Sequence, residues 1–267
     1  MKKMHLLPNI LTALGLMCGL FVIFKLNMTH VGDVNEETLR IAAGFLLLAG
    51  LCDLFDGALA RALHIESEFG GLFDSLSDAV TFGVAPSVIV LKSISADPGT
   101  FGSFLITTGA LVYSMCGVLR LVRFSVSNAK MPLQNDLDVT SKSQFVGLPI
   151  PAGAAAVVSL NFLLISPEFQ TYFDFSLEVR TVFLFISLAF LGYLMISRVR
   201  FPSLKGLQTK VTSFSVIFSM IMAASFLFYG LVYHFPIVLF LVAWGYLLGS
   251  CAYSSYRFLR AKARTRR

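Results

Sequence analysis

The chain has 267 residues, of which 56% are hydrophobic and 13% are charged, and its mean hydropathy is +0.78. This composition is too apolar for one or two water-soluble domains and indicates an integral membrane protein. Membrane topology and attraction to anionic membrane lipids explain the net charge of +6, so we expect no nucleic-acid partner.

Apolar windows of about 20 residues recur along the chain, each long enough to cross a ~30 Å hydrocarbon core. Strand-like alternation is absent, which favours helices over a barrel. The first window follows two lysines, as in a signal peptide, but no A-x-A-like cleavage site follows, so we expect a first membrane helix. The predicted fold is an all-α polytopic membrane protein of about eight transmembrane helices. Their spans lie near 9–27, 39–60, 70–93, 101–125, 146–166, 178–198, 211–233 and 235–256.

The basic residues predict the orientation of these helices. With the spans above, every Lys and Arg lies on one side of the membrane except Lys25, Arg40, Lys92 and Arg180. Because basic loops stay in the cytoplasm, we expect both termini and the segment around Arg61 to face the cytoplasm from the inner membrane.

Charge is concentrated in residues 53–78, DLFDGALARALHIESEFGGLFDSLSD. At 100° per residue, Asp53 and Asp56 share one face of the second helix, and Asp74 and Asp78 share one face of the third. The short link makes the two helices antiparallel neighbours, so these faces can meet near the cytoplasmic surface. We therefore expect four carboxylates to converge.

Four uncompensated aspartates would cost on the order of 10 kcal/mol in a bilayer, at about 3 kcal/mol each. Mutual repulsion could leave some of them protonated, but one or two hard divalent cations explain four acids beside one arginine better. Oxygen donors without histidine or thiolate favour Mg²⁺, Mn²⁺ or Ca²⁺ over zinc. Since Mg²⁺ prefers few carboxylates plus substrate phosphate oxygens, a phosphate-bearing substrate is predicted.

Residues 53–78 contain the pattern D-x2-D-G-x2-A-R-x8-G-x3-D-x3-D. At every fixed position it resembles the signature of the CDP-alcohol phosphotransferase family, membrane enzymes of phospholipid synthesis. Outside it, the chain resembles the bacterial and archaeal phosphatidylserine synthase branch, over roughly residues 6–205. The supporting strings are LPNILTALGLMCG, FDSLSDAVTFGVAPS, CGVLRLVRFSVSN, FVGLPIPAGAAA and LMISRVRFPSLK. The chain departs at Ser77 and Val122, where alanine is expected, and at Ser125, where asparagine is expected.

The resemblance implies transfer of a phosphatidyl group from CDP-diacylglycerol to the hydroxyl of L-serine, with release of CMP. It also implies Mg²⁺ or Mn²⁺ as cofactor, as one or two ions with Ca²⁺ as a further occupant. By the same resemblance Asp53, Asp56 and Asp74 hold metal, and Asp78 both completes a metal site and acts as general base. Relatives that use glycerol 3-phosphate or inositol phosphate are the alternative within the family.

Further residues are candidates for substrate binding. Small residues beside the acids either leave room for a ligand or allow close helix packing, and Arg61 either contacts the diphosphate or anchors the topology. Asn9 and Thr12 either assist the nucleotide or cap a helix. For the serine carboxylate we consider Arg120 and Arg123, whose alternative role is also topological. The CDP-lipid candidates are Gly57, Ala60, Arg61, Gly70, Asn9 and Thr12.

A cation transporter is the main alternative from another class, because intramembrane acids often line ion paths. It would place acids near the midplane, whereas these cluster at one predicted membrane face. The predicted organisation is a six-helix core at 1–205, two further helices of the same membrane domain at 206–256, and a basic cytoplasmic tail at 257–267. The resemblance to the family suggests a homodimer. We also expect contact with membrane lipids.

Overall fold

The computed structural model describes residues 6–30, 34–63, 67–94, 96–97, 99–129, 144–173, 175–197, 200–202 and 234–264. Within these residues, six helical segments are long and apolar enough to cross a membrane. The predicted all-α membrane fold is therefore confirmed. The predicted span 211–233 lies outside the described residues. The last residues of the predicted basic tail, 265–267, also lie outside them.

The N-terminal half of the fold consists of α1 (Leu6–Asn27), α2 (Glu36–Leu63) and a third span, Glu68–Ser93. This third span was predicted as one regular helix, but three segments compose it. They are α3 (Glu68–Asp78), the π-helix η1 (Ala79–Val84) and α4 (Ala85–Ser93). A π-helix adds one residue to a turn, and hydropathy alone carries no sign of it.

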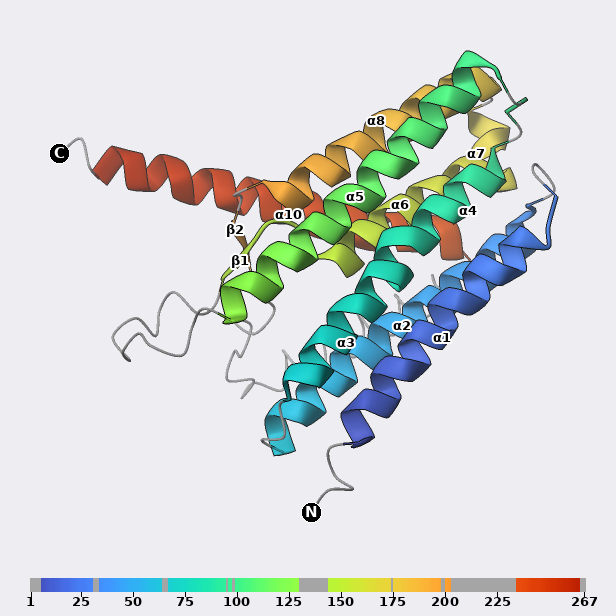
Figure 1. Cartoon of the computed structure of the whole chain (residues 1–267). Coiled ribbons are helices and arrows are strands. Elements are labelled where there is room, and N and C mark those ends of the chain that lie inside the picture. The colour runs from blue at the N-terminus through green and yellow to red at the C-terminus, as the bar shows by residue number, and fades with distance from the viewer. Residues whose placement is uncertain are drawn as a thin grey trace, which may run out of the picture.

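The remaining helices are α5 (Phe101–Ala129), α6 (Ile150–Ile165), the short α7 (Pro167–Tyr172), α8 (Leu177–Ile196) and α10 (Phe235–Arg264). In Figure 1, α5 and α8 run side by side, as α1 and α2 do, and α10 crosses the bundle beside α6. Helix α10 continues through Arg264, so much of the predicted tail is helical.

The segment just before α6 is a short β-strand, whereas the sequence predicted helix from residue 146. Strand β1 (Gln144–Val146) pairs with β2 (Arg200–Pro202), with Phe145 opposite Phe201. Gly147 follows at φ +88°, a conformation that favours glycine, and Pro149 then precedes the first helical residue. The chain is thereby turned before α6 begins.

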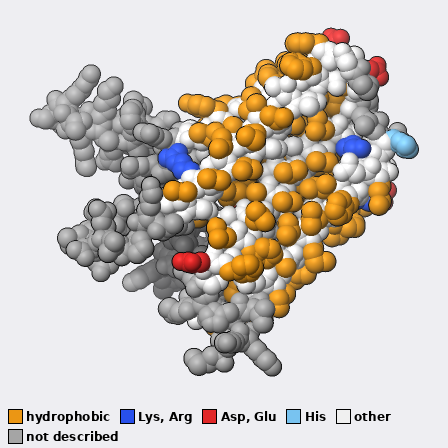
Figure 2. Space-filling view, in the orientation of Figure 1, with side chains coloured by type: hydrophobic (Ala, Val, Ile, Leu, Met, Phe, Trp, Pro, Cys, Tyr) orange, Lys and Arg blue, Asp and Glu red, His pale blue; other side chains and the backbone are white. Residues whose placement is uncertain are grey.

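Helix α6 lies at the centre of the protein, since its residues are buried almost continuously from Gly153 to Leu164. Apolar side chains of α5, α6 and α8 make up most of one buried cluster, those of α1 and α2 make up most of another, and α4 and α6 contribute to both. The outer surface is also apolar: Figure 2 shows hydrophobic side chains across the described face, with charged groups near its margins. A surface of this kind suits hydrocarbon, and the chain is an integral membrane protein.

Candidate active site

Three aspartates from two helices converge at one end of the bundle. Asp53 and Asp56 project from α2 and Asp74 from α3, and one carboxylate oxygen from each lies within 4.8 Å of the others. Asp56 is buried, at 4% exposure, while Asp53 and Asp74 are half-buried. The spacing in α2 puts two acids on one face, and the short α2–α3 link brings that face to α3.

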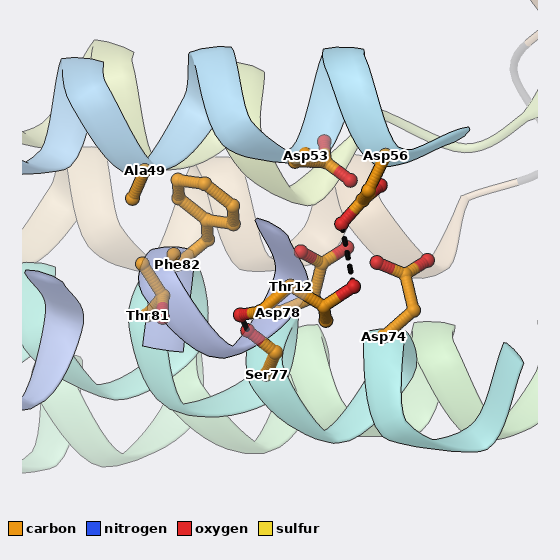
Figure 3. A pocket seen from close by; sticks show the side chains of 10 residues that line it. Thr12, Ala49, Asp53, Asp56, Asp74, Ser77, Asp78, Thr81 and Phe82 are labelled. Atoms are coloured by element: carbon orange, nitrogen blue, oxygen red, sulfur yellow. Dashed lines mark hydrogen bonds between the residues drawn. The ribbon is translucent and has the colours of Figure 1, made fainter. Parts of the chain in front are cut away.

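Asp78 lies one helical turn beyond Asp74, on the wall of the same small cavity. In Figure 3, the side chains of Asp53 and Asp56 project from α2 toward Asp74 and Asp78, whose side chains project from α3 toward α2. The cavity is about 10 Å³, the space of roughly one water molecule. The predicted convergence of the two acidic faces is thus present in the fold.

Helix α1 holds one of these carboxylates in place. The Thr12 hydroxyl donates a hydrogen bond to Asp56 Oδ2 at 2.6 Å and lies 3.1 Å from the carbonyl oxygen of Pro8. Ser77 in turn donates to the Thr12 carbonyl oxygen at 3.3 Å, which ties α3 to α1 (Figure 3). Thr12, considered from sequence as a nucleotide ligand, therefore contacts an acid directly.

The acidic cluster opens into a much larger cavity of about 850 Å³. Asp53, Asp74, Asp78 and Arg120 lie on its wall, whereas most of the remaining lining is apolar and comes from α2, α5, α6 and α10. A cavity of this size can hold a large ligand, with charge at one end and hydrocarbon along the rest.

The two arginines considered from sequence lie differently. Arg120 is half-buried on the wall of the large cavity, where its charge interacts with that of Asp78. Its Nε is buried and has no hydrogen-bond partner within the described part of the chain. Arg123 is exposed and donates to the Ile196 carbonyl oxygen at 3.3 Å, so it links α5 to the end of α8. It lines neither cavity.

The remaining predicted residues lie around the same end of the bundle. Gly57 lines the large cavity, and Ala60 is half-buried in the next turn of α2. A Cβ at Gly70 would lie 3.1 Å from Asn9 Oδ1, so α1 and α3 approach closely here. The side chain of Arg61 lies outside the described residues.

Sequence reasoning missed several cavity residues. Ser75 lies on the wall and its hydroxyl is 3.3 Å from that of Ser125. Leu239 and Tyr246 of α10 also line the cavity, although no motif marked either of them. Among these residues, Ser75 alone could have been found from the sequence, because it directly follows Asp74 in the acidic part of α3.

The donor set of this cluster fits a hard divalent cation. Three carboxylates offer oxygen ligands, without histidine or thiolate in the group, and their mutual approach within 4.8 Å would be repulsive without positive charge. Helix α1 packs against both α2 and α3 and thereby holds the acids of the two helices together.

Comparison with known proteins gives a consistent result. The sequence pattern of the CDP-alcohol phosphatidyltransferase family matches residues 5–193. A Bacillus subtilis (strain 168) protein named CDP-diacylglycerol–serine O-phosphatidyltransferase is 34% identical over 202 residues, covering 76% of this chain and 93% of the relative. Proteins of the same name from Helicobacter pylori (strain 26695) and Methanocaldococcus jannaschii are 30% and 29% identical. Those alignments cover 81% and 75% of this chain, and 80% and 76% of the relatives.

Proposed function

The chain belongs to the CDP-alcohol phosphatidyltransferase family, and on this premise we propose that it is a phosphatidylserine synthase. It transfers the phosphatidyl group of CDP-diacylglycerol to the hydroxyl of L-serine and releases CMP. The names of the relatives support this acceptor, and an acidic cluster that opens into a large, mostly apolar cavity supports a lipid diphosphate as donor.

Asp53, Asp56 and Asp74 hold divalent metal in this proposal, and Asp78 completes a second position. Mg²⁺ and Mn²⁺ are the proposed ions, with Ca²⁺ as a further occupant, because each accepts oxygen ligands. When bound, such an ion would screen the diphosphate oxygens and stabilise the leaving CMP. The bond between Thr12 and Asp56 keeps one carboxylate oriented toward the cluster.

Asp78 is the proposed general base. It lies on the wall of both cavities, so a hydroxyl in the large cavity can approach it without leaving the acidic end. The serine oxygen attacks the phosphorus that carries the diacylglycerol, its proton passes to Asp78, and the bond from that phosphorus to the CMP oxygen breaks. The phosphorus–oxygen bond to serine replaces it.

Arg120 is the proposed ligand of the serine carboxylate. Its guanidinium reaches the large cavity near Asp78, and a planar guanidinium suits a carboxylate. Arg123 is a weaker candidate because it is exposed and bonded to the end of α8. We assign the nucleotide end of the donor to Gly57, Ala60, Arg61 and Gly70. Gly57 lines the large cavity, and the other three lie on α2 and α3 between the two pairs of acids.

Helix α10 belongs to the same membrane domain in this proposal, although the family match ends at residue 193. Trp244 donates to the Ala156 carbonyl oxygen of α6 at 3.1 Å, and Leu239 and Tyr246 line the cavity. We therefore extend the predicted core at 1–205 by at least this helix and assign its inner face to the lipid part of the donor.

The positive-inside distribution supports an active site and both termini that face the cytoplasm, in the inner membrane. The start of α1, the end of α2, the start of α3 and the end of α5 are at the same, lower-left end of the bundle in Figure 1, and we assign this end to the cytoplasmic membrane face. A homodimer is part of the proposal on family grounds.

The observation that carries the proposal is the opening of the aspartate cluster into the lipid-sized cavity. The test is CMP release from CDP-diacylglycerol by the purified protein, with serine, glycerol 3-phosphate and inositol 1-phosphate offered in parallel. We expect serine-dependent release with Mg²⁺ or Mn²⁺ and none after chelation with EDTA. Faster release with a phosphorylated acceptor would overturn the serine assignment, and undiminished release in EDTA would overturn the metal assignment.

A further inference from the structure

The π-helix η1 begins directly after Asp78, in the middle of a membrane span. The amide of Ala85 bonds to the carbonyl oxygen of Val80, five residues back, instead of the residue four back. One inserted residue turns the following helix by about 100° relative to an unbroken α-helix. The π turn therefore sets how the face carrying Asp78 is rotated relative to α4.

The residues before and after this junction must each face a particular part of the protein. Before it, Asp74 and Asp78 face the acids of α2. After it, Ile89 and Val90 of α4 are fully buried in the two apolar clusters. If the turn relaxed to a regular α-helix, either the carboxylates would rotate away from α2 or the α4 side chains would leave the core. Only the inserted residue satisfies both.

Side chains of α5 bind the carbonyl groups of the π turn. Tyr113, with no exposed surface, donates from its hydroxyl to the Phe82 carbonyl oxygen at 3.0 Å. Ser114 donates to the Gly83 carbonyl oxygen at 2.9 Å, and its oxygen is 2.8 Å from that of Ser87. Buried carbonyl groups displaced from a regular helical ladder need such partners.

Helix α1 packs closely against η1 as well. A Cβ at Gly19 would lie 2.8 Å from the Cα of Thr81, closer than real side chains approach a backbone. Only glycine allows this contact, so η1 is enclosed between α1 and α5. A π turn held from two sides keeps one geometry.

We propose that Tyr113 and Ser114 are positioning residues that keep Asp78 aimed at the acidic cluster by holding the π turn. The inference rests on the proposed function: the kinetic readout uses the proposed reaction, and the Mn²⁺ readout uses only the proposed metal role of the acidic cluster. Neither residue lines either cavity, so neither touches substrate. Their effect passes through the Phe82 and Gly83 carbonyl groups to the helix that carries Asp78.

The experiment compares Tyr113→Phe, Ser114→Ala and the double variant with wild type in detergent. We expect the double variant to lower kcat for serine-dependent CMP release about tenfold or more, with KM for CDP-diacylglycerol changed less than twofold. We also expect weaker binding of Mn²⁺, measured by electron paramagnetic resonance without substrate, by about threefold or more. Ser114→Thr, which keeps the hydroxyl, should restore at least half of the kcat lost in Ser114→Ala.

Ser187→Ala is the matched control, because Ser187 is buried and donates to the Phe183 carbonyl oxygen within α8 at 2.8 Å. Equal loss of kcat in this control, or wild-type kcat and Mn²⁺ binding in the double variant, would overturn the proposal. If the double variant does not fold, Tyr113→Phe is judged by the same criteria. If wild type releases no CMP with serine, the proposed function fails, and the Mn²⁺ comparison still decides the positioning role.

Discussion

The two ends of the large cavity differ in the side chains that line them: one end is charged and the other is apolar. At one end, Asp53, Asp74, Asp78 and Arg120 meet, close to the ends of α2 and α5. Along the rest, the lining is largely alanine, leucine, valine and proline from α2, α6 and α10. The charged residues of the lining lie at one end of the cavity, where metal and a nucleotide would offset their charge in the proposed function, and the rest of the lining is apolar.

This contrast predicts two kinds of sensitivity. The acidic end depends on single atoms, such as the Thr12 hydroxyl that donates to Asp56 at 2.6 Å. The apolar end depends on volume, because side chains there touch a ligand without directional bonds. Substitutions at the first end should therefore change kcat or the serine KM strongly, and those at the second should change lipid preference modestly.

The largest effect is expected when one carboxylate of the cluster is removed. Asp53→Asn keeps the shape but removes a charged metal ligand, and we expect CMP release to fall about 1,000-fold, or some 4 kcal/mol of transition-state stabilisation. Asp97→Asn is the control, since Asp97 is exposed in the α4–α5 connection. Initial rates of CMP release measure both, and more than one tenth of wild-type activity in Asp53→Asn would contradict the metal role.

A smaller loss is expected when the support of Asp56 is removed. Thr12→Val replaces the hydroxyl with a methyl group of similar size, and a hydrogen bond to a charged group is worth about 1.5–3 kcal/mol. We expect kcat to fall about 10- to 100-fold and the Mn²⁺ requirement to rise. Thr108→Val is the control, because its hydroxyl donates to the Phe104 carbonyl oxygen within α5 at 2.8 Å, away from the acidic cluster. Equal losses in both variants would contradict a role specific to the acidic end.

Substitutions in the proposed serine site should mainly change the KM for serine. Arg120→Lys keeps the charge but loses the planar, two-pronged donor, and we expect KM for serine to rise about tenfold with KM for CDP-diacylglycerol unchanged. Arg123→Lys should change serine KM less than threefold, because Arg123 lies outside the cavity. Steady-state kinetics with each substrate varied tests the pair, and the opposite order of effects would move the acceptor site toward Arg123.

The smallest effect is expected at the apolar end. Leu239→Trp would fill part of the cavity beside α10, and we expect about a threefold shift of kcat/KM toward CDP-diacylglycerol with short acyl chains. Leu241→Trp is the control, since Leu241 is 62% exposed on the same helix. Competition between short-chain and long-chain donors measures the shift. No difference between the two variants would remove α10 from the lipid site.

The sequence by itself determined the membrane class, the positions of six of the predicted spans and of the shorter helix α6, and the meeting of the acidic faces of α2 and α3. These follow from local properties: apolar length, helical period and a short connection. Asp53 and Asp56 share a face because they are three residues apart, and Asp74 and Asp78 because they are four apart. The short α2–α3 link accounts for the meeting of the two faces, and α1, which packs against both helices, supports it.

Only the tertiary structure decided the contacts between segments far apart in the chain. The bond of Thr12 to Asp56, the placement of Arg120 but not Arg123 in the cavity, and the contribution of α10 each depend on how helices pack. The π turn after Asp78 is of the same kind. No local pattern marks it, because it resolves a conflict between acids that must face α2 and apolar residues that must face the core. Such a conflict exists only once the neighbouring helices are in place.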